Sequence, residues 1–182
     1  MELAVIKKYF ALLVAMFWLS ASSASADQAL TADDFKQLKP QRVAEYFYAE
    51  RYGPGNMGLE TTLAYQFNYF LSDHWLLGAM VSGAALGNRS GYGTASLGLG
   101  RVQAIACNLD GICQAYLGAG GGHGLPTGGG LVLNLCGGLR WALIDHVGLG
   151  INVGVLNFIS GDFVLSYINL GIFNNFNILS LP

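Results

Sequence analysis

Glycine crowds one stretch of the sequence, Tyr116–Gly130, in which eight of fifteen residues are Gly and His123 lies in the middle. A P-loop that binds phosphate ends in Gly-Lys-Ser/Thr, and no Lys follows Lys39 in this chain. The dinucleotide-binding spacing fails as well, because His123 stands where a third Gly should follow Gly118 and Gly120. Glycine within strands marks bends and close backbone approach, so the stretch predicts a structural role.

The three histidines could supply acid–base or metal chemistry only if they met in space. His74 and His146 lie in the short polar segments SDHW and IDHV, between apolar runs, where turns are expected. His123 belongs to the glycine-rich stretch, which we place at the opposite end of the molecule. We therefore predict no catalytic residue, no metal site and no cofactor-binding site.

Cysteine chemistry is concentrated around one predicted turn, CNLDGIC, which Cys107 and Cys113 flank with Asp110 and Gly111 at its tip. In an exported protein this spacing favours a disulfide across a hairpin. Cys136 is left over and is expected to be a buried, inert thiol. A free reactive thiol or lipid-linked pairing is the alternative for Cys136.

Charged residues on interior positions need partners, because burying an unpaired charge is costly. Glu45, Glu60 and Arg140 fall on the phase of their segments that we expect to face inward. Arg140 should then pair with Glu60 or Glu45, and this ion network would plug the interior. Such networks are ordinary packing in a protein interior and do not by themselves indicate catalysis.

The first 26 residues have the pattern of a cleaved signal peptide. Lys7 and Lys8 precede an apolar core, Tyr9–Leu19, and Ala24-Ser25-Ala26 supplies a cleavage site. An uncleaved anchor is the alternative. Residues 27–41 are polar and predict a periplasmic lead-in with a short helix, since Thr31 and Asp34 form a capping box.

Composition narrows the class of the remaining residues, 42–182. After the signal peptide there are seven Lys+Arg against ten Asp+Glu, so the chain offers no basic face for nucleic acid. Hydrophobic residues make up 53% of the sequence and mean hydropathy is +0.43, yet no apolar run after residue 26 reaches the roughly 20 residues of a spanning helix. Only helices and closed barrels can span a bilayer, because every backbone polar group must be paired there. Elimination therefore predicts a transmembrane β-barrel.

The period of hydrophobicity agrees with strands. In Leu59–Phe70 the odd positions are apolar or aromatic and the even ones mainly polar, as lipid-facing and interior faces require. Leu131–Leu143 and Val147–Asn157 alternate in the same way, with odd positions outward. Turn residues between the apolar runs then divide the chain into eight strands, and an even number suits an up-and-down antiparallel barrel. The predicted strands are 43–52, 58–71, 75–87, 92–106, 113–123, 130–143, 147–157 and 162–176.

Within this barrel, Gly118, Gly120 and Gly122 should face inward and leave room for bulkier groups from the opposite wall, since an eight-stranded barrel is barely wide enough for side chains. Aromatic residues gather near the predicted strand ends, as in an interfacial girdle. They are Tyr46, Tyr48, Tyr69, Phe70, Trp75, Trp141, Phe173 and Phe176.

This layout resembles the small eight-stranded Gram-negative outer-membrane barrels, OmpA/OmpX-like in architecture, over roughly Val43–Phe176. In NLGIFNNF, residues Asn169, Gly171 and Phe176 match the closing barrel-assembly signal, whereas Asn174 does not. The resemblance implies insertion by the barrel-assembly machinery, contact with outer-membrane lipids and lipopolysaccharide, and localisation in the cell outer membrane.

A second resemblance is to PagL-like lipid A deacylase barrels, through the segment that runs from Gly58-Leu59-Glu60 to Tyr65-Gln66-Phe67. That family hydrolyses an acyl ester of lipid A with a Ser–His pair in a motif like H-H-x-S-N. Here Ser160 is in place, but Phe158 stands where the catalytic His should be. Because a serine without an adjacent base is a poor nucleophile, the resemblance implies that this chemistry is absent.

These patterns favour a non-enzymatic outer-membrane barrel with a structural or interaction role. The alternatives are a lipid A-modifying acyl hydrolase with a degenerate or divergent site around Ser160 or His123, and a narrow pore. The sequence does not indicate an oligomeric state.

Overall fold

Eight β-strands make up the fold of this protein, as seen in a computed structural model that describes residues 41–53, 59–87, 91–122, 128, 130–161 and 163–178. The strands are β1 Gln41–Tyr52, β2 Leu59–Phe70, β3 Trp75–Gly87, β4 Gly93–Ala106, β5 Leu109–Gly121, β6 Leu131–Ala142, β7 Val147–Phe158 and β8 Phe163–Ile178. No helix within the described ranges is long and apolar enough to cross a membrane. The expected signal peptide and lead-in helix lie outside these ranges, except that Gln41 already belongs to β1.

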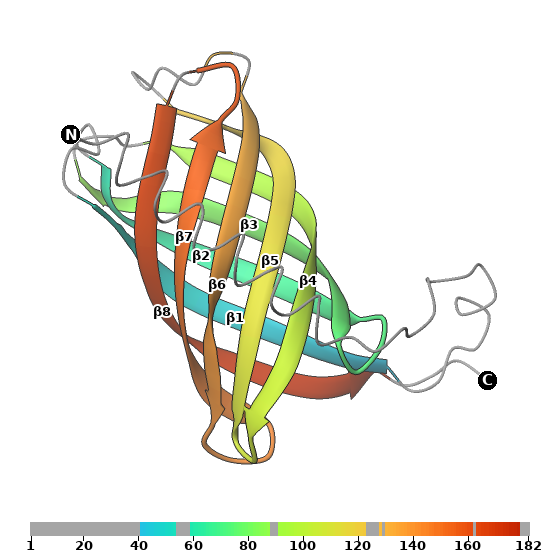
Figure 1. Ribbon diagram of the computed structural model, residues 1–182. Helices are drawn as coiled ribbons and strands as arrows, with labels where there is room; N and C mark the ends of the chain where they lie inside the picture. Colours follow the sequence, from blue (N-terminus) through green and yellow to red (C-terminus); the bar gives the residue numbers. More distant parts are fainter. Residues whose placement is uncertain are drawn as a thin grey trace.

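The strands form one closed antiparallel barrel in which each strand pairs with its neighbours in sequence and β1 pairs with β8 (Figure 1). The register that closes it runs from Gln41↔Ile178 to Tyr52↔Tyr167 without interruption. Closure leaves no unpaired strand edge, which is the requirement for a β-structure in hydrocarbon. The expected eight-stranded up-and-down barrel is confirmed. Seven of the eight strands match their predicted starts within two residues, and β5 begins four residues earlier than expected.

The two faces of the wall differ in polarity, and they alternate along each strand as the period-two pattern of β2, β6 and β7 predicted. In β1 to β7 the even-numbered residues face the interior, except at the end of β3, where a register shift leaves Leu86 exposed; in β8 the odd-numbered ones face the interior. Large apolar side chains stay exposed on the outer wall of every strand, and Leu97, at 65%, is among the most exposed. Such a continuous exposed apolar surface suits lipid and not water.

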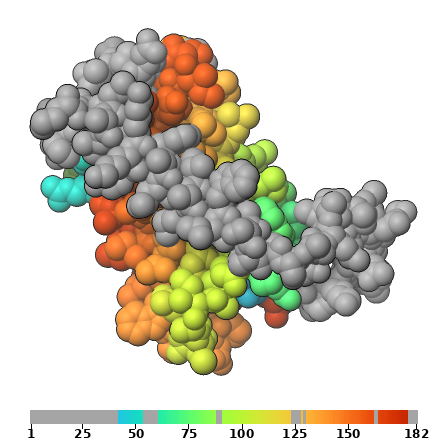
Figure 2. All heavy atoms as spheres, viewed as in Figure 1, coloured from blue at the N-terminus to red at the C-terminus, as the bar shows by residue number. Residues whose placement is uncertain are grey.

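The two ends of the barrel are built differently. At one end, here the turn end, lie the start of β1, the end of β8 and the short turns β2–β3, β4–β5 and β6–β7. The β4–β5 and β6–β7 hairpins project together there (Figures 1 and 2), and Ala142 N donates to Asn108 O between them. The opposite end, here the loop end, carries the connections β1–β2, β3–β4, β5–β6 and β7–β8.

The aromatic girdle is only partly as expected. Trp75 and Trp141 do lie on the outer wall close to the turn end, exposed to 37% and 57%. Four of the aromatics point into the barrel instead and are buried; they are Tyr46, Tyr48, Phe70 and Phe173. A narrow barrel has to be filled by large side chains, so aromatic residues near a strand end need not be interfacial anchors.

Candidate functional site in the barrel lumen

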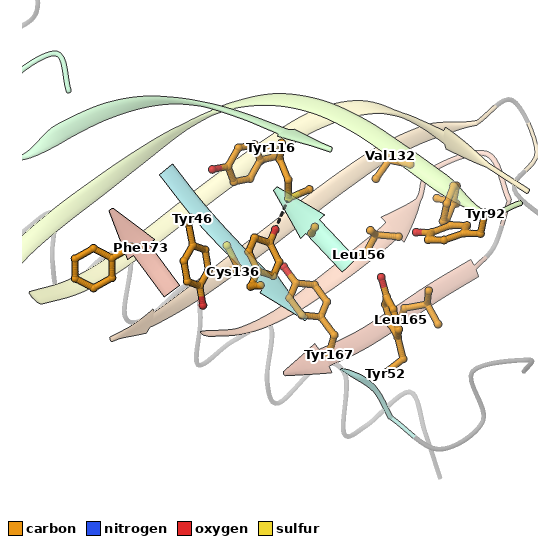
Figure 3. Packing of buried hydrophobic residues seen from close by; sticks show 14 residues of the cluster. Tyr46, Tyr52, Tyr92, Tyr116, Val132, Cys136, Leu156, Leu165, Tyr167 and Phe173 are labelled. Atoms are coloured by element: carbon orange, nitrogen blue, oxygen red, sulfur yellow. Dashed lines mark hydrogen bonds between the residues drawn. The ribbon is translucent and has the colours of Figure 1, made fainter. Parts of the chain in front are cut away.

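In the part of the chain that the structure describes, polar side chains converge in the lumen of the barrel, and they do so in three layers. Buried aromatic and aliphatic residues from all around the wall point into it; Tyr46 and Phe173 lie toward one end, and Tyr52, Tyr92 and Leu165 toward the other (Figure 3). Between them lie polar side chains that are less than a tenth exposed. These are Glu50, Thr62, Gln66, Asn68, Thr94, Ser96, Gln114, Asn134, Arg140, Asn152 and Asn169.

The layer nearest the loop end is organised by a buried carboxyl group. Glu50, on β1, is 1% exposed, and its Oε2 accepts hydrogen bonds from Tyr52 Oη at 2.9 Å and Thr62 Oγ1 at 2.8 Å. Its other oxygen, Oε1, has no partner. Glu50 comes level with Thr62 because β1 and β2 pair in the register Glu50↔Thr62.

The middle layer links opposite walls through amides. Gln66 Nε2, on β2, donates to Asn68 Oδ1 at 2.6 Å and to Gln114 Oε1, on β5, at 3.0 Å. Gln114 Nε2 donates in turn to Asn68 Oδ1 at 3.0 Å and to Tyr116 Oη at 2.7 Å. β2 and β5 are not neighbours in the sheet, so these bonds cross the lumen and tie its walls together.

A second set of bonds crosses the lumen beside the amides. Tyr167 Oη, on β8, donates to Asn134 Oδ1, on β6, at 2.8 Å. Asn134 Nδ2 and Tyr48 Oη both donate to the sulfur of Met80, at 3.7 Å and 2.9 Å. Four strands, β1, β3, β6 and β8, are joined in this way. Because each bond replaces contact with water in a buried setting, the loss of any one partner leaves another polar group unsatisfied.

The layer nearest the turn end contains a buried cation. Arg140, on β6, is 4% exposed, and its Cζ lies 5.6 Å from the ring centre of Tyr46 and 5.8 Å from that of Phe173. Its Nε and Nη2 have no hydrogen-bond partner. Asn152 Nδ2 donates to Asn169 Oδ1 at 2.9 Å close by, on the neighbouring strands β7 and β8.

Glycines make room where aromatic rings lie against the wall. A Cβ at Gly150 would come within 2.8 Å of the Tyr46 ring, one at Gly78 within 2.5 Å of Tyr116 Oη, and one at Gly154 would overlap the Tyr167 ring. The glycines of the glycine-rich stretch differ. Cβ atoms at Gly118, Gly120 and Gly122 would clash with Ser96, Thr94 and Tyr92 of β4 or the segment before it. Glycine is required at these positions because the adjacent strand approaches closely. The expected reason, bulkier groups on the opposite wall, is not the one that the contacts show.

The expected ion network is wrong in its partners. Arg140 faces inward as predicted, but Glu45 lies on the outer wall, where its Oε1 accepts a hydrogen bond from Tyr65 Oη at 2.6 Å. Glu60 lies at the loop end of β2, whereas Arg140 is near the turn end of β6, and the Glu60 side chain is outside the described part of the structure. The buried carboxyl group is that of Glu50, which the sequence analysis missed. Its inward phase follows from the register with β2, whose polar face was recognised correctly.

The predicted disulfide is not formed, because Cys107 and Cys113 are both free thiols. The tight turn is Cys107–Asn108, and β5 begins at Leu109, so the Asp110-Gly111 pair lies within a strand and not at a tip. Cys113 pairs with Arg101 in the β4–β5 register. Cys107 lies in the turn before Leu109, and Cys113 lies four positions beyond Leu109 along the strand, about 13 Å at roughly 3.3 Å per residue. A disulfide needs Cα atoms within about 7 Å.

We therefore expect three reactive thiols in the unfolded, unreduced protein, measured by mass spectrometry after maleimide labelling. In the folded protein Cys107, which is exposed at the turn, should label first, and Cys136, which is buried in the lumen, should be protected. Cys107→Ser is the matched control and should remove the fast label. A deficit of two thiols in the unreduced, unfolded protein would contradict the free state.

The other sequence-level candidates do not come together. His74 and His146 are exposed in two turns at the turn end, and His123 lies outside the described residues. Among the residues that the structure describes, no group of three or more His, Cys, Asp or Glu could hold a metal ion. Ser160 is exposed at the loop end, whereas Phe158 is buried and its ring centre lies 6.3 Å from that of Tyr92.

The closed barrel, its apolar outer wall and its polar interior define the fold as that of a small transmembrane β-barrel. Solved structures of similar fold include a de novo designed transmembrane β-barrel, with 13% identity over 76% of this chain and 98% of that chain and a TM-score of 0.58. The N-terminal β-barrel domain of Pseudomonas aeruginosa OprF is 14% identical over 76% of this chain and 100% of that chain, with a TM-score of 0.57. The designed barrel TMB2.3 is 18% identical over 79% of this chain and 99% of that chain, with a TM-score of 0.52. At these identities the likeness is one of fold alone. No protein-family model and no curated protein matches this sequence.

Proposed function

We propose that this chain is a small integral outer-membrane β-barrel protein of a Gram-negative envelope, non-enzymatic, with a structural or interaction role. The observation that carries the proposal is the inversion of polarity across the wall. Large apolar side chains face outward on all eight strands, and amides, hydroxyls, the Glu50 carboxyl group and the Arg140 guanidinium group face inward. A water-soluble barrel would place these groups the other way round.

The partners follow from this placement. Outer-membrane lipids and lipopolysaccharide contact the apolar wall, and the barrel-assembly machinery inserts the chain, for which β8 carries Phe176 near its end. The turn end faces the periplasm and the loop end faces the cell exterior, because short turns characterise the periplasmic side of such barrels. A cleaved signal peptide in residues 1–26 would bring the chain to this location.

The experiment is a pair of arginine substitutions followed through outer-membrane fractionation and a heat-modifiable gel shift. Leu97→Arg places a charge in the middle of the outer wall of β4 and should lower the barrel's free energy of unfolding in lipid by about 2–4 kcal/mol, with loss of the unboiled, faster-migrating band. Gln103→Arg, at the exposed turn end of the same strand, is the matched control and should keep both the band and the outer-membrane location.

A water-soluble protein would give a different result. Leu97 would then be in contact with water, and both arginine substitutions would be tolerated equally. Equal tolerance, or recovery of the wild-type chain in the soluble or inner-membrane fraction, would overturn the proposal.

The non-enzymatic part of the proposal rests on the surroundings of Ser160. Phe158, which stands in the place of the base in the deacylase motif, points into the lumen and packs against Tyr92. A serine hydroxyl needs an adjacent base to act as a nucleophile. Mass spectra of lipid A from cells with and without the gene should therefore be identical; a loss of one acyl chain in expressing cells would favour the hydrolase instead. The packed side chains of the lumen offer nothing that favours the pore.

A further inference from the structure

Arg140 has a charged group that the interior of the barrel does not satisfy. The side chain is 4% exposed, and two of its nitrogens, Nε and Nη2, have no hydrogen-bond partner. These two N–H groups point the same way along one edge of the guanidinium plane. That edge is the fork that receives two oxygens of a carboxylate or a phosphate. A buried arginine with this whole edge open is unusual, because buried charges are normally paired.

The groups around Arg140 stabilise a cation without supplying a counter-charge. Tyr46 and Phe173 present their rings at 5.6 Å and 5.8 Å, a cation–π arrangement. The positive charge of Arg42, which lies over the ring of Phe70 at the same end, also acts on Arg140. This layer of the lumen therefore contains cations and aromatic rings, and the place of an anion at the Nε–Nη2 edge of Arg140 is open.

The carboxylates of the described residues do not fill that place. Glu45 is on the outer wall and bonded to Tyr65, and Glu50 is in the layer nearest the loop end, bonded to two hydroxyl groups. Asp110 lies directly opposite Arg140 in the β5–β6 register, yet it accepts no hydrogen bond from Nε or Nη2.

We propose that the Nε–Nη2 edge of Arg140 binds a small oxyanion, a carboxylate or a phosphate, inside the turn end of the barrel. The strand position puts the site close to the turn end, since Arg140 is two residues from the end of β6 on the side of the short turns. The interior of an eight-stranded barrel is just wide enough for side chains. The ligand is accordingly of the size of formate or inorganic phosphate.

The neighbouring amides can supply one more donor. Tyr46 Oη lies 2.9 Å from both Gly150 O and Asn169 Oδ1, and its single proton serves the carbonyl oxygen, which can only accept. With the amides of both Asn169 and Asn152 turned by 180°, the Asn169 nitrogen donates to Tyr46 Oη and to the Asn152 oxygen, and the Asn152 nitrogen takes the place of the unpartnered Oδ1. That atom lies against Gly138, two residues from Arg140 on the same inward face.

The test is a titration of the folded full-length barrel in detergent with sodium phosphate and, separately, with sodium formate, at constant ionic strength in a chloride buffer. The readouts are isothermal titration calorimetry and the ¹⁵N–¹H resonance of the Arg140 Nε–H group. We expect saturable one-to-one binding of at least one anion and a shift of the Arg140 resonance that saturates at the same concentration. Comparison of the two arms tells a phosphate source from a carboxylate source.

Two variants distinguish the contribution of the paired N–H donors of Arg140 from that of its positive charge. Arg140→Lys keeps the charge and removes the paired donors, so affinity should fall by about tenfold or more; Arg140→Gln should abolish binding. Arg51→Gln, at an exposed position on the outer wall of β1, is the matched control and should bind as the wild type does. If the Arg140 variants fail to give the heat-modifiable band, the wild-type resonance titration decides. An Arg140 resonance unmoved by both anions, or binding retained in Arg140→Gln, would overturn the proposal and leave the guanidinium hydrated by water alone.

Discussion

Gly154→Ala is expected to lower the barrel's free energy of unfolding by about 1–3 kcal/mol, measured by urea titration in lipid vesicles with tryptophan fluorescence. The new methyl group would overlap the ring of Tyr167, which crosses from β8 over Gly154 in the paired register Gly154↔Tyr167. The ring has nowhere to move. Tyr167 is 5% exposed, and its hydroxyl group donates to Asn134 Oδ1 at 2.8 Å. Its ring packs edge-on against Tyr52, with the ring centres 6.0 Å apart.

The decisive measurement is the same substitution in a Tyr167→Ala background. Tyr167→Ala alone should cost about 3–5 kcal/mol, because it opens a cavity and removes a partner of Asn134. With the ring gone, the atoms nearest a Cβ at position 154 are gone too. Ala is favoured over Gly inside a strand by roughly 0.5–1 kcal/mol, so Gly154→Ala should become neutral or stabilising there. The double-mutant cycle should show a coupling of about 2–3 kcal/mol.

Gly83→Ala is the matched control for this cycle. Gly83 lies on the outer wall of β3, and the nearest atom to an added Cβ is 3.7 Å away, an ordinary contact. Its effect should be the same in both backgrounds, neutral or stabilising by up to about 1 kcal/mol. Additive effects of Gly154→Ala and Tyr167→Ala would show that the ring is not what makes glycine necessary at position 154.

The barrel itself could be derived from the sequence because the two faces of its wall differ in kind. In β2, β6 and β7 lipid-facing leucine, valine and aromatic residues alternate with amides and glycines, and the predicted facing of all three strands is confirmed. The number of strands followed from turn residues, and the requirement that a membrane structure be closed supplied the topology.

The predictions that were wrong concern strands whose two faces carry similar kinds of residue. Tyr46 and Tyr48 on β1 resemble lipid-facing residues, yet they fill the lumen and direct their hydroxyl groups to polar partners. The opposite phase was therefore assigned to β1, which placed Glu45 inside and left Glu50 unnoticed. The predicted disulfide was wrong for a different reason. The distance between Cys107 and Cys113 depends on where the turn lies, and the sequence between them allows a turn at more than one place.

The register between strands carries information that single-strand periodicity lacks. Position 154 requires glycine because of the Tyr167 ring on the next strand, and position 118 because of Ser96 on its neighbouring strand. Neither neighbour can be identified from the sequence of the strand that carries the glycine. The same is true of Arg140, whose facing was predicted but whose lack of a partner depends on Glu50 lying in a different layer. Contacts across the lumen, and not the local pattern, determine the chemistry of this interior.

Glu50→Ala is expected to lower the free energy of unfolding by about 2–4 kcal/mol, measured in the same vesicle assay, because the hydroxyls of Tyr52 and Thr62 lose the oxygen to which they donate. Glu50→Gln keeps an oxygen of the same shape at that position. In the described part of the chain Glu50 accepts only from neutral groups, and no ion pair offsets the cost of burying its charge. The amide should therefore be as stable as the carboxylate or more so, by up to about 1 kcal/mol.

Glu45→Gln is the control for charge alone, since Glu45 lies on the outer wall with one hydrogen bond to Tyr65, and its effect should be below about 1 kcal/mol. If Glu50→Gln were as destabilising as Glu50→Ala, the carboxylate would have to be neutralised by a cation, and Arg140 is the cation that the lumen offers. The two charges would then act as a pair across the layers. The expected tolerance of glutamine instead keeps them independent, with a neutral acceptor sufficient at the loop end and an anion still required at the turn end.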